Sequence, residues 1–318
     1  MEDSNLREMN AYFLINKFCN FDCPYCFIPK EKRKNPLLKG NRNIESIIEF
    51  FNNSKRKWHI GFTGGEPFLS PRFIELCIGL TQKNIIRINT NLSSDLIYEF
   101  AEKIDPKKVE SINWSVHLTE IERLKTKNVL IKKFHMLRDR GFNISASLVV
   151  WPKYLDKSLF SEKKIIKIYN EFKKNGICLC TYPFIGEYKG KMYPESFAPQ
   201  ELKLILNLLK NTQYKCFKIP SDYIKKNTKI ITGHLSFKGM LCSAGTNHVA
   251  ITENGDVKRC HSNTKILGNI YKKNVKYLKS PSLCESEICG CYWEGIINAI
   301  GKPKTIFLKP GDKFQIPA

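Results

Sequence analysis

Three cysteines lie close together near the start of the chain, in the segment CNFDCPYCF at positions 19–27. Cys19, Cys23 and Cys26 are separated by three and then two residues, and Tyr25 precedes the last of them. Three thiolates can hold three irons of a [4Fe–4S] cube, which leaves the fourth iron open to another ligand. A zinc site is the alternative, but zinc takes four tetrahedral ligands, often from paired cysteines two residues apart. The uneven spacing favours an iron–sulfur cluster with one vacant coordination position.

A glycine-rich segment, FTGGEPFL at 62–69, closes the second of the predicted strands. Gly64 and Gly65 let a backbone approach a ligand closely, because they carry no side chain. Glu66 supplies the anion that a bound ammonium group needs. This segment alone is weak evidence, but it follows the cysteine segment in the order that a barrel site requires.

Together, the two segments resemble the radical SAM superfamily, whose motif C-x3-C-x-aromatic-C is matched here at every defined position. The resemblance implies that the open iron binds S-adenosylmethionine (SAM), which one electron cleaves into methionine and a 5′-deoxyadenosyl radical. Tyr25 would contact the adenine, the GGEP segment would bind the SAM ammonium, and polar residues at later strand ends would contact the rest. Each of those polar residues could equally be an ordinary polar residue at the end of a strand, without a role toward SAM. The implied cofactor-binding set is Tyr25, Gly64, Gly65, Glu66, Pro67, Asn91, Ser115 and Ser147.

Five further cysteines lie near the C-terminus, at Cys242, Cys260, Cys284, Cys289 and Cys291. The first two flank a predicted hairpin, which resembles the start of the SPASM and twitch extensions that bind auxiliary [4Fe–4S] clusters; the rest departs from the full SPASM pattern. Five cysteines support one such cluster, because two cubes held by thiolates alone would need about eight. The predicted ligands are Cys242 and Cys260 with two of the other three. One thiol is then left over, and we take Cys284 as this residue and as a candidate hydrogen donor. A structural zinc ion is the alternative to the cluster.

The elements that position these segments follow from the hydrophobic pattern. Apolar, β-branched runs predict six strands, and segments with helical periodicity lie between them, so the sheet should be parallel. The predicted fold is α/β, a partial (β/α)6 TIM-like barrel of the radical SAM type with a small C-terminal β-hairpin and helix iron–sulfur extension. The predicted domains are a core at 1–190, a connecting segment at 191–240 and an auxiliary-cluster domain at 241–318. The predicted strands span 12–18, 60–63, 85–90, 112–117, 144–150 and 177–184.

Turn and cap residues predict where several elements begin and end. Ser70 before Pro71, and Ser93 or Ser94, should cap helices. One long helix over 119–140 should end at Gly141. Helices are also predicted from Asn43 and over 201–210, and a hairpin over 248–252 and 256–260 should turn at Gly255.

Composition excludes several classes of protein. The net charge of +22 comes from 52 Lys and Arg against 30 Asp and Glu, spread along the whole chain. We therefore expect a solvated basic surface and no nucleic-acid partner. No apolar run approaches the roughly 18 residues of a membrane span, and the N-terminus resembles no signal peptide. Twelve cysteines in such a chain point to reduced or metal-bound thiols and a cytoplasmic location, without a membrane partner.

The predicted reaction is the removal of a substrate hydrogen atom, followed by epimerisation if a thiol returns hydrogen, or dehydrogenation if the auxiliary cluster accepts an electron. The first barrel strand begins within the first dozen residues, which favours a small sugar-like or anionic substrate over a peptide bound by a leader-binding domain. A peptide- or protein-modifying maturase is the alternative, and a non-catalytic iron–sulfur electron carrier is another. The expected electron source is an external one-electron reductant such as flavodoxin or ferredoxin.

Overall fold

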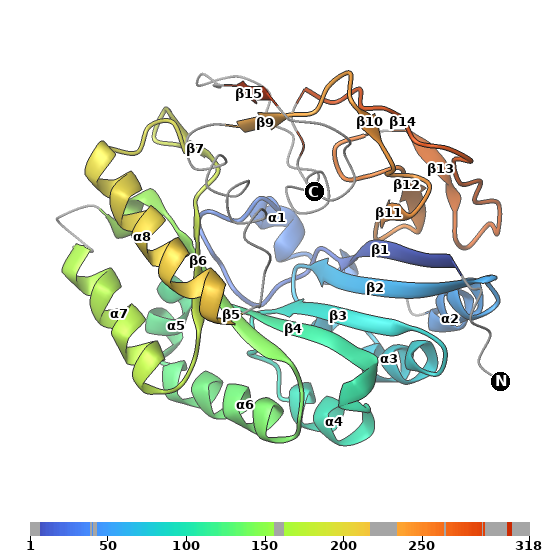
Figure 1. The fold of residues 1–318 in the computed structure, drawn as a ribbon. Coiled ribbons are helices and arrows are strands. Elements are labelled where there is room, and N and C mark those ends of the chain that lie inside the picture. The colour runs from blue at the N-terminus through green and yellow to red at the C-terminus, as the bar shows by residue number, and fades with distance from the viewer. Residues whose placement is uncertain are drawn as a thin grey trace. The chain divides into compact units, whose positions relative to one another are not determined.

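The computed structural model describes residues 7–38, 40, 43–155, 162–216, 234–263, 265–287, 289 and 304–306. By their contacts, the residues form two compact units. Figure 1 shows the helices and strands in chain order, from blue at the N-terminus to red at the C-terminus. The first comprises Met1–Ile144 with Cys242–Ser282, and the second comprises Ser145–Leu241 with Leu283–Pro317. The domain limits expected from the sequence stay a prediction.

Parallel strands form the centre of the first unit. The strands β1 (Arg7–Asn16), β2 (Arg56–Gly64), β3 (Ile85–Thr90) and β4 (Val109–Ser115) follow one another in the sheet, each parallel to the next. Side chains alternate between buried and half-buried along β3, which is the period-two pattern that predicts it. The carboxyl ends of these strands carry both predicted cofactor segments.

The C-terminal hairpin extends this same sheet. Strand β11 (His248–Ile251) pairs in parallel with the free side of β1, and Tyr12 lies opposite Ala250. The strands β12 (Asp256–Lys258) and β13 (Ile266–Asn269) follow in antiparallel order. The hairpin and its turn at Gly255, with φ of +80°, confirm the sequence prediction. Its addition to the central sheet is a feature that the sequence pattern does not indicate.

Helices and 3-10 turns connect the strands of the first unit. Asn43 caps α2, because its side chain accepts a hydrogen bond from Ser46 N at 3.2 Å. The elements are α1 (Lys30–Arg33), η1 (Pro36–Leu38), α2 (Ile44–Asn52), η2 (Pro67–Leu69), α3 (Phe73–Thr81), α4 (Leu96–Lys103), η3 (Pro106–Lys108), α5 (Leu118–Leu124) and α6 (Lys127–Asp139).

Two predictions about these helices are wrong. Ser70 ends η2 and does not cap α3. The N-cap residue of α3 is Arg72, which has a left-handed conformation with φ of 55°. The predicted helix over 119–140 is two helices, because Lys125 adopts φ of 54° and ends α5. The second of them does end before Gly141, whose φ is +88°. For α4 the N-cap residue is Asp95, and the Ser94 side chain accepts from Leu96 N at 3.3 Å.

The second unit continues the alternation of strands and helices. Strand β5 (Ile144–Val150) pairs in parallel with β6 (Leu179–Pro183), and α8 contains the predicted helix over 201–210. The remaining elements of this unit are η4 (Pro152–Tyr154), α7 (Glu162–Lys174), β7 (Gly186–Tyr188), β8 (Lys191–Tyr193), α8 (Pro199–Cys216), β9 (His234–Ser236) and β15 (Lys304–Ile306). The short strands β10 (Leu241–Cys242) and β14 (Ser282–Leu283) each have one residue in either unit.

The six predicted strands are all present as β1 to β6, and they alternate with helices along the chain. Within each unit their pairing is parallel. The core beneath them is built from large side chains such as Trp58, Phe62 and Trp114, which are completely or almost completely buried. This mixed α/β arrangement confirms the predicted fold class.

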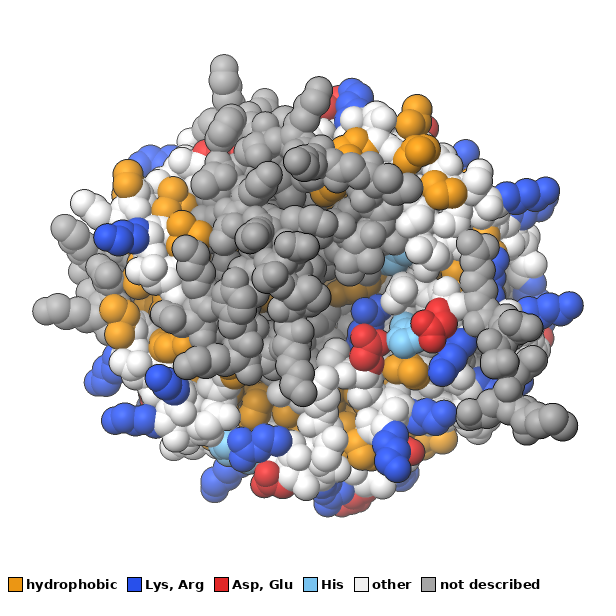
Figure 2. Space-filling view, in the orientation of Figure 1, with side chains coloured by type: hydrophobic (Ala, Val, Ile, Leu, Met, Phe, Trp, Pro, Cys, Tyr) orange, Lys and Arg blue, Asp and Glu red, His pale blue; other side chains and the backbone are white. Residues whose placement is uncertain are grey.

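Basic side chains do not gather in one patch on the visible face. Figure 2 shows lysine and arginine side chains dispersed among acidic and apolar ones over the described surface of that face. Several basic side chains of the described residues form ion pairs, as Lys103 does with Glu99 and Arg72 with Glu45. Among the described residues, no helix is long and apolar enough to cross a membrane.

Candidate cofactor site

The three cysteines of the first segment lie together in the loop that follows β1. Cys19 and Cys23 are buried and pack with Phe21 in one cluster, against which Tyr25 and Cys26 lie half-buried. Two backbone bonds shape the loop: Cys26 N donates to the Cys23 carbonyl at 3.2 Å, and Cys19 N donates to the Arg33 carbonyl at 2.9 Å. The structure therefore brings together the trio predicted from the sequence.

Burial controls the protonation of these thiols. It raises the pKa of Cys19 to about 12, with the nearby Glu66 and Cys26 adding to the effect and Lys34 opposing it. Burial and the other two cysteines also raise the pKa of Cys23, and burial raises that of Cys26. Without a bound metal the three thiols are protonated at neutral pH. Iron ligation must therefore displace their protons.

The donor set is of the kind that holds an iron–sulfur cube. Three thiols lie in one apolar cluster with Phe21 and Tyr25. Thiolate ligands in an apolar pocket are what iron–sulfur clusters use.

Glu66 lies at the end of β2, and its carboxylate is completely buried. One carboxylate oxygen accepts from Thr90 Oγ1 at 2.7 Å and from Phe68 N at 3.1 Å, and the other accepts from Asn91 N at 2.7 Å. Burial raises the pKa of Glu66 to about 7, although these three hydrogen bonds favour the ionised form. The carboxylate therefore ties the end of β2 to the end of β3. Its contact with a SAM ammonium stays a prediction, as does the cofactor role of Pro67, which begins η2.

Gly64 and Gly65 serve close packing of two strand ends. A Cβ atom on Gly65 would overlap the carbonyl of Phe18, and one on Gly64 would overlap the carbonyl of Asn16. Gly64 also has φ of +144°, which side chains disfavour. From the sequence, we explain these glycines by the close approach of a ligand to the backbone. The structure shows a different reason: the missing side chains leave room for the backbone that leads from β1 into the cysteine loop.

Asn16 is a residue that sequence reasoning missed. It is completely buried at the end of β1. Its Nδ2 donates to the Glu66 carbonyl at 2.8 Å and to Ser70 Oγ at 2.5 Å, and its Oδ1 accepts from Gly65 N at 3.0 Å. A single asparagine thus binds the GGEP segment to the start of the cysteine loop. The available signal was a polar residue directly after the apolar run at 11–15 of β1.

Asn91 connects the end of β3 with the first cysteine. Its Nδ2 lies 3.8 Å from Cys19 Sγ, within the longer range of hydrogen bonds to sulfur, and 3.0 Å from Asn20 Oδ1. Asn20 in turn donates to Ser93 Oγ at 2.8 Å. Asn91 therefore contacts a cluster ligand, in addition to its predicted role toward SAM.

Tyr25 is held by His117, just beyond the end of β4. The Tyr25 hydroxyl lies 3.0 Å from His117 Nδ1, and the two rings are tilted with centroids 5.9 Å apart. Burial lowers the pKa of His117 to about 4, so its ring is neutral at physiological pH. Ser115 is the last residue of β4 and is half-buried. Its contact with SAM stays a prediction.

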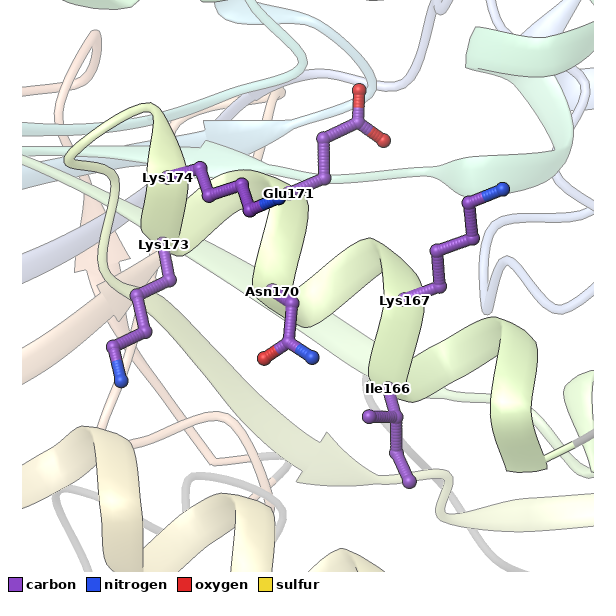
Figure 3. A pocket seen from close by; sticks show the side chains of 6 residues that line it. All are labelled: Ile166, Lys167, Asn170, Glu171, Lys173 and Lys174. Atoms are coloured by element: carbon purple, nitrogen blue, oxygen red, sulfur yellow. The ribbon is translucent and has the colours of Figure 1, made fainter.

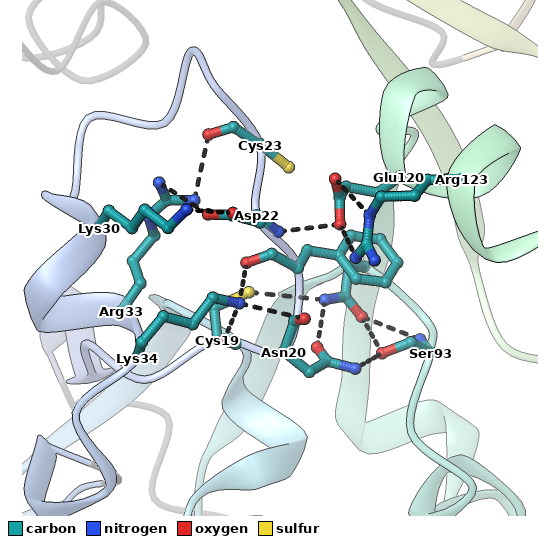
Figure 4. Close-up of polar contacts among 12 residues, drawn as sticks. Cys19, Asn20, Asp22, Cys23, Lys30, Arg33, Lys34, Ser93, Glu120 and Arg123 are labelled. Atoms are coloured by element: carbon teal, nitrogen blue, oxygen red, sulfur yellow. Dashed lines mark hydrogen bonds and ion pairs between the residues drawn. The ribbon is translucent and has the colours of Figure 1, made fainter.

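Charged residues hold the cysteine loop from outside, and the sequence pattern did not single them out (Figure 4). Arg33, almost fully buried, donates to the Cys23 carbonyl at 3.1 Å. Glu120 accepts from Asp22 N at 2.9 Å and forms an ion pair with Arg123. Lys34 donates to three loop carbonyls. No local motif marks these residues, because several of their partners lie far away along the chain.

Comparison with known proteins gives the family of this region. Residues 13–160 match the model of the radical SAM superfamily. The chain contains a radical SAM superfamily domain. No sequence among the curated proteins matches this chain.

Several solved structures share the fold. The protein named anSMEcpe, solved with bound AdoMet, is 18% identical with a TM-score of 0.59, over 84% of this chain and 79% of that one. SuiB from Streptococcus suis is 16% identical with a TM-score of 0.54, over 84% of this chain and 64% of that one. At these identities the likeness shows the fold alone.

Outside the radical SAM domain, two of the five C-terminal cysteines lie together in the first unit. Cys242 is buried at the end of β10, and burial raises its pKa, with nearby Cys260 adding to the shift. Arg259 donates to the Cys242 carbonyl at 3.1 Å. Cys260 is half-buried after β12.

The other predicted site residues belong elsewhere. Cys284, half-buried, and Cys289, buried, lie in the second unit, as does Ser147 in β5. Cys291 falls outside the described residues. Cys178 is disulfide-bonded, so the expectation of reduced or metal-bound thiols is wrong for this residue.

A surface hollow of about 870 Å³ lies on the face of α7 (Figure 3). The described residues that line it are Ile166, Lys167, Asn170, Glu171, Lys173 and Lys174. All come from one helix, and none belongs to the predicted cofactor set. It carries no part of the candidate site.

Proposed function

We propose that this protein is a radical SAM enzyme that binds a [4Fe–4S] cluster through Cys19, Cys23 and Cys26 and cleaves SAM reductively. The observation that supports this most is the meeting of the cysteine loop with the ends of β2 and β3. There the Glu66 carboxylate accepts from Asn91 N, and the Asn91 amide lies at Cys19 Sγ. Two motifs far apart in the sequence thus join in one structure, as a shared ligand requires.

When bound, the cluster and SAM supply one-electron cleavage and a 5′-deoxyadenosyl radical that removes a hydrogen atom from an unactivated C–H bond. The residues of this chain hold and orient those groups. Tyr25, fixed by His117, would face the adenine, and the anionic form of Glu66 would attract the ammonium. The rings of Phe21 and Tyr25 pack against the cysteines of the loop.

The direct test is release of 5′-deoxyadenosine from SAM by anaerobically reconstituted protein with dithionite. We expect release by the wild type and by Cys77→Ala, because Cys77 is a buried core thiol of α3. The Cys23→Ala variant should release none. A Cys23→Ala protein that keeps full turnover, or a wild type that binds zinc in place of iron, would refute the proposal. An iron–sulfur electron carrier would bind the cluster but release no 5′-deoxyadenosine.

For the reaction that follows, we infer epimerisation or dehydrogenation of a small sugar-like or anionic substrate, within an oxidoreductase or epimerase class. Product formed in deuterated water distinguishes the two outcomes. An epimerase places solvent deuterium on the substrate carbon through an exchangeable thiol, for which Cys284 is the candidate. A dehydrogenase leaves that carbon without solvent deuterium.

A peptide substrate is the second candidate, and one observation favours it. The solved neighbours include anSMEcpe with a bound Kp18Cys peptide and SuiB bound to its precursor peptide SuiA. Short peptides and sugar phosphates offered in parallel would distinguish the classes, since only the true class should increase 5′-deoxyadenosine release and be consumed.

We further propose one auxiliary [4Fe–4S] cluster of SPASM or twitch type. Cys242 and Cys260 with two of Cys284, Cys289 and Cys291 would supply its ligands. The effect of Cys260 on the pKa of Cys242, which requires that the two thiols lie near each other, supports the first pair. An external reductant such as flavodoxin or ferredoxin would deliver the electron.

A further inference from the structure

Lys34 follows the short helix α1, and its side chain reaches back to the cysteine loop (Figure 4). Its Nζ donates to the carbonyl oxygens of Cys19 at 3.2 Å, Asn20 at 3.3 Å and Phe21 at 2.9 Å. An ammonium group has three donor hydrogens, so the three carbonyls match its full capacity. The loop thereby fixes a positive charge against the backbone of the first cysteine.

The same cysteine receives a second polar contact, on its sulfur. Asn91 Nδ2 points its amide hydrogen at Cys19 Sγ over 3.8 Å. Arg33 acts similarly on the next ligand, through the Cys23 carbonyl at 3.1 Å. The carboxylate of Asp22 pairs with Arg33 and Lys30 at this loop, whereas Lys34 is the cation that contacts three successive carbonyls.

A positive charge at this place has a definite effect on electron transfer. Reduction adds one electron to the cluster without a proton, so the charge of the cluster becomes more negative by one. A nearby fixed cation stabilises the reduced form more than the oxidised form. Net charge and hydrogen bonds to the ligands are among the factors that set cluster potentials.

We propose that Lys34 is a positioning residue that raises the reduction potential of the cluster bound by Cys19, Cys23 and Cys26. It holds a fixed charge beside the first ligand and so eases the entry of the electron from the reductant. The inference rests on the proposed function, because it presupposes a cluster on these cysteines.

The test is a redox titration of the reconstituted cluster without SAM, followed by electron paramagnetic resonance, on wild type and Lys34→Met. At the wild-type midpoint potential, the ratio of reduced to oxidised cluster should be at least roughly threefold lower in Lys34→Met. Lys34→Arg, which keeps the charge, should stay close to the wild type. Higher ionic strength should narrow the difference, because Lys34 is exposed at the surface.

Lys30→Met is the matched control. It removes the same charge one helical turn earlier, at the start of α1, but the Lys30 ammonium pairs with the Asp22 carboxylate at 2.9 Å and is largely exposed. Lys30→Met should therefore shift the potential less than Lys34→Met. Equal potentials in wild type and Lys34→Met, or equal shifts in both methionine variants, would overturn the inference.

Iron content separates the remaining outcomes. If Lys34→Met loses its iron while Lys34→Arg keeps it, the ammonium acts in cluster retention, and the claim about potential is wrong. If the wild type itself binds no cluster, the proposed function fails and this inference fails with it, whereas a wild type that binds the cluster and shows no effect of Lys34 overturns this inference alone.

Discussion

Glu66 combines a structural and a predicted binding role in one carboxylate. Its oxygens accept from Thr90, Phe68 and Asn91, so the side chain would be needed for local order even without a ligand. A pKa of about 7 places the group between its two protonation states near neutrality. A SAM ammonium beside it would favour the ionised form.

This raised pKa makes the stability of the cluster-free protein depend on pH. Below the ordinary value of 4.5 both folded and unfolded chains hold the proton, and between 4.5 and about 7 only the folded chain does. The stabilising contribution is therefore complete below pH 4.5 and is lost as pH rises through 7, by up to about 3 kcal/mol. Urea unfolding of wild type and Glu66→Gln at pH 5 and pH 7.5 measures it. The stability difference between the two proteins should change with pH, and a constant difference would contradict the prediction.

The pair of Tyr25 and His117 yields a second prediction at this scale. Removing either side of their 3.0 Å contact should weaken SAM binding by about threefold to tenfold, since one hydrogen bond orients the ring. Tyr25→Phe and His117→Phe remove the same interaction. The double variant should therefore have about the same affinity for SAM as the single variant with the lower affinity. Equilibrium binding of SAM to reconstituted protein is the measurement. Additive losses would show that the two residues act separately.

Strands β1 and β2 approach each other most closely where the cofactor segments begin. A methyl group on Gly65 would meet backbone atoms of Phe18, which cannot move without displacing the cysteine loop. Gly65→Ala should therefore destabilise the protein by about 1–3 kcal/mol or more and lower its iron content. Gly61→Ala is the control in the same strand, because its Cβ would meet its nearest atoms at 3.6 Å, an ordinary contact. Thermal unfolding of both variants should separate them, and equal midpoints would contradict this account.

The elements that the sequence predicts best are those set by local alternation of side chains. β3 and β5 have the predicted limits, 85–90 and 144–150, because buried and less buried residues alternate along β3 and along most of β5. The break at Lys125 was missed because a non-glycine residue in the left-handed conformation leaves no mark in the helical period. The pairing of β11 with β1 depends on contacts across more than 200 residues, which no local pattern records.

The candidate site divides in the same way. The cysteine trio and the GGEP segment are short motifs whose chemistry depends on residue type and spacing, so sequence reasoning finds them. Asn16 and Lys34 donate hydrogen bonds to backbone carbonyl groups. Every residue has such a group, so the sequence does not show which residues these two side chains contact. The structure is needed to show what orders the motifs.

At the scale of the whole molecule, the proposed function predicts two iron–sulfur clusters per chain. Cys242 and Cys260 belong to the first unit, and Cys284 and Cys289 to the second. If the proposed auxiliary cluster exists, reconstituted wild type should hold about eight irons per chain, and Cys242→Ala should hold about four. Its loss should leave SAM cleavage by the first cluster in place, because the radical SAM match ends at residue 160.

Iron and sulfide analysis, with release of 5′-deoxyadenosine on the same samples, checks this prediction. Cys77→Ala is the control for loss of a buried thiol, and it should keep the wild-type iron content. Wild type with about four irons per chain would exclude the auxiliary cluster and leave Cys242 and Cys260 as structural thiols or ligands of another metal. Dehydrogenation would then lack its internal electron acceptor, and epimerisation through a thiol would be the outcome that the remaining cysteines support.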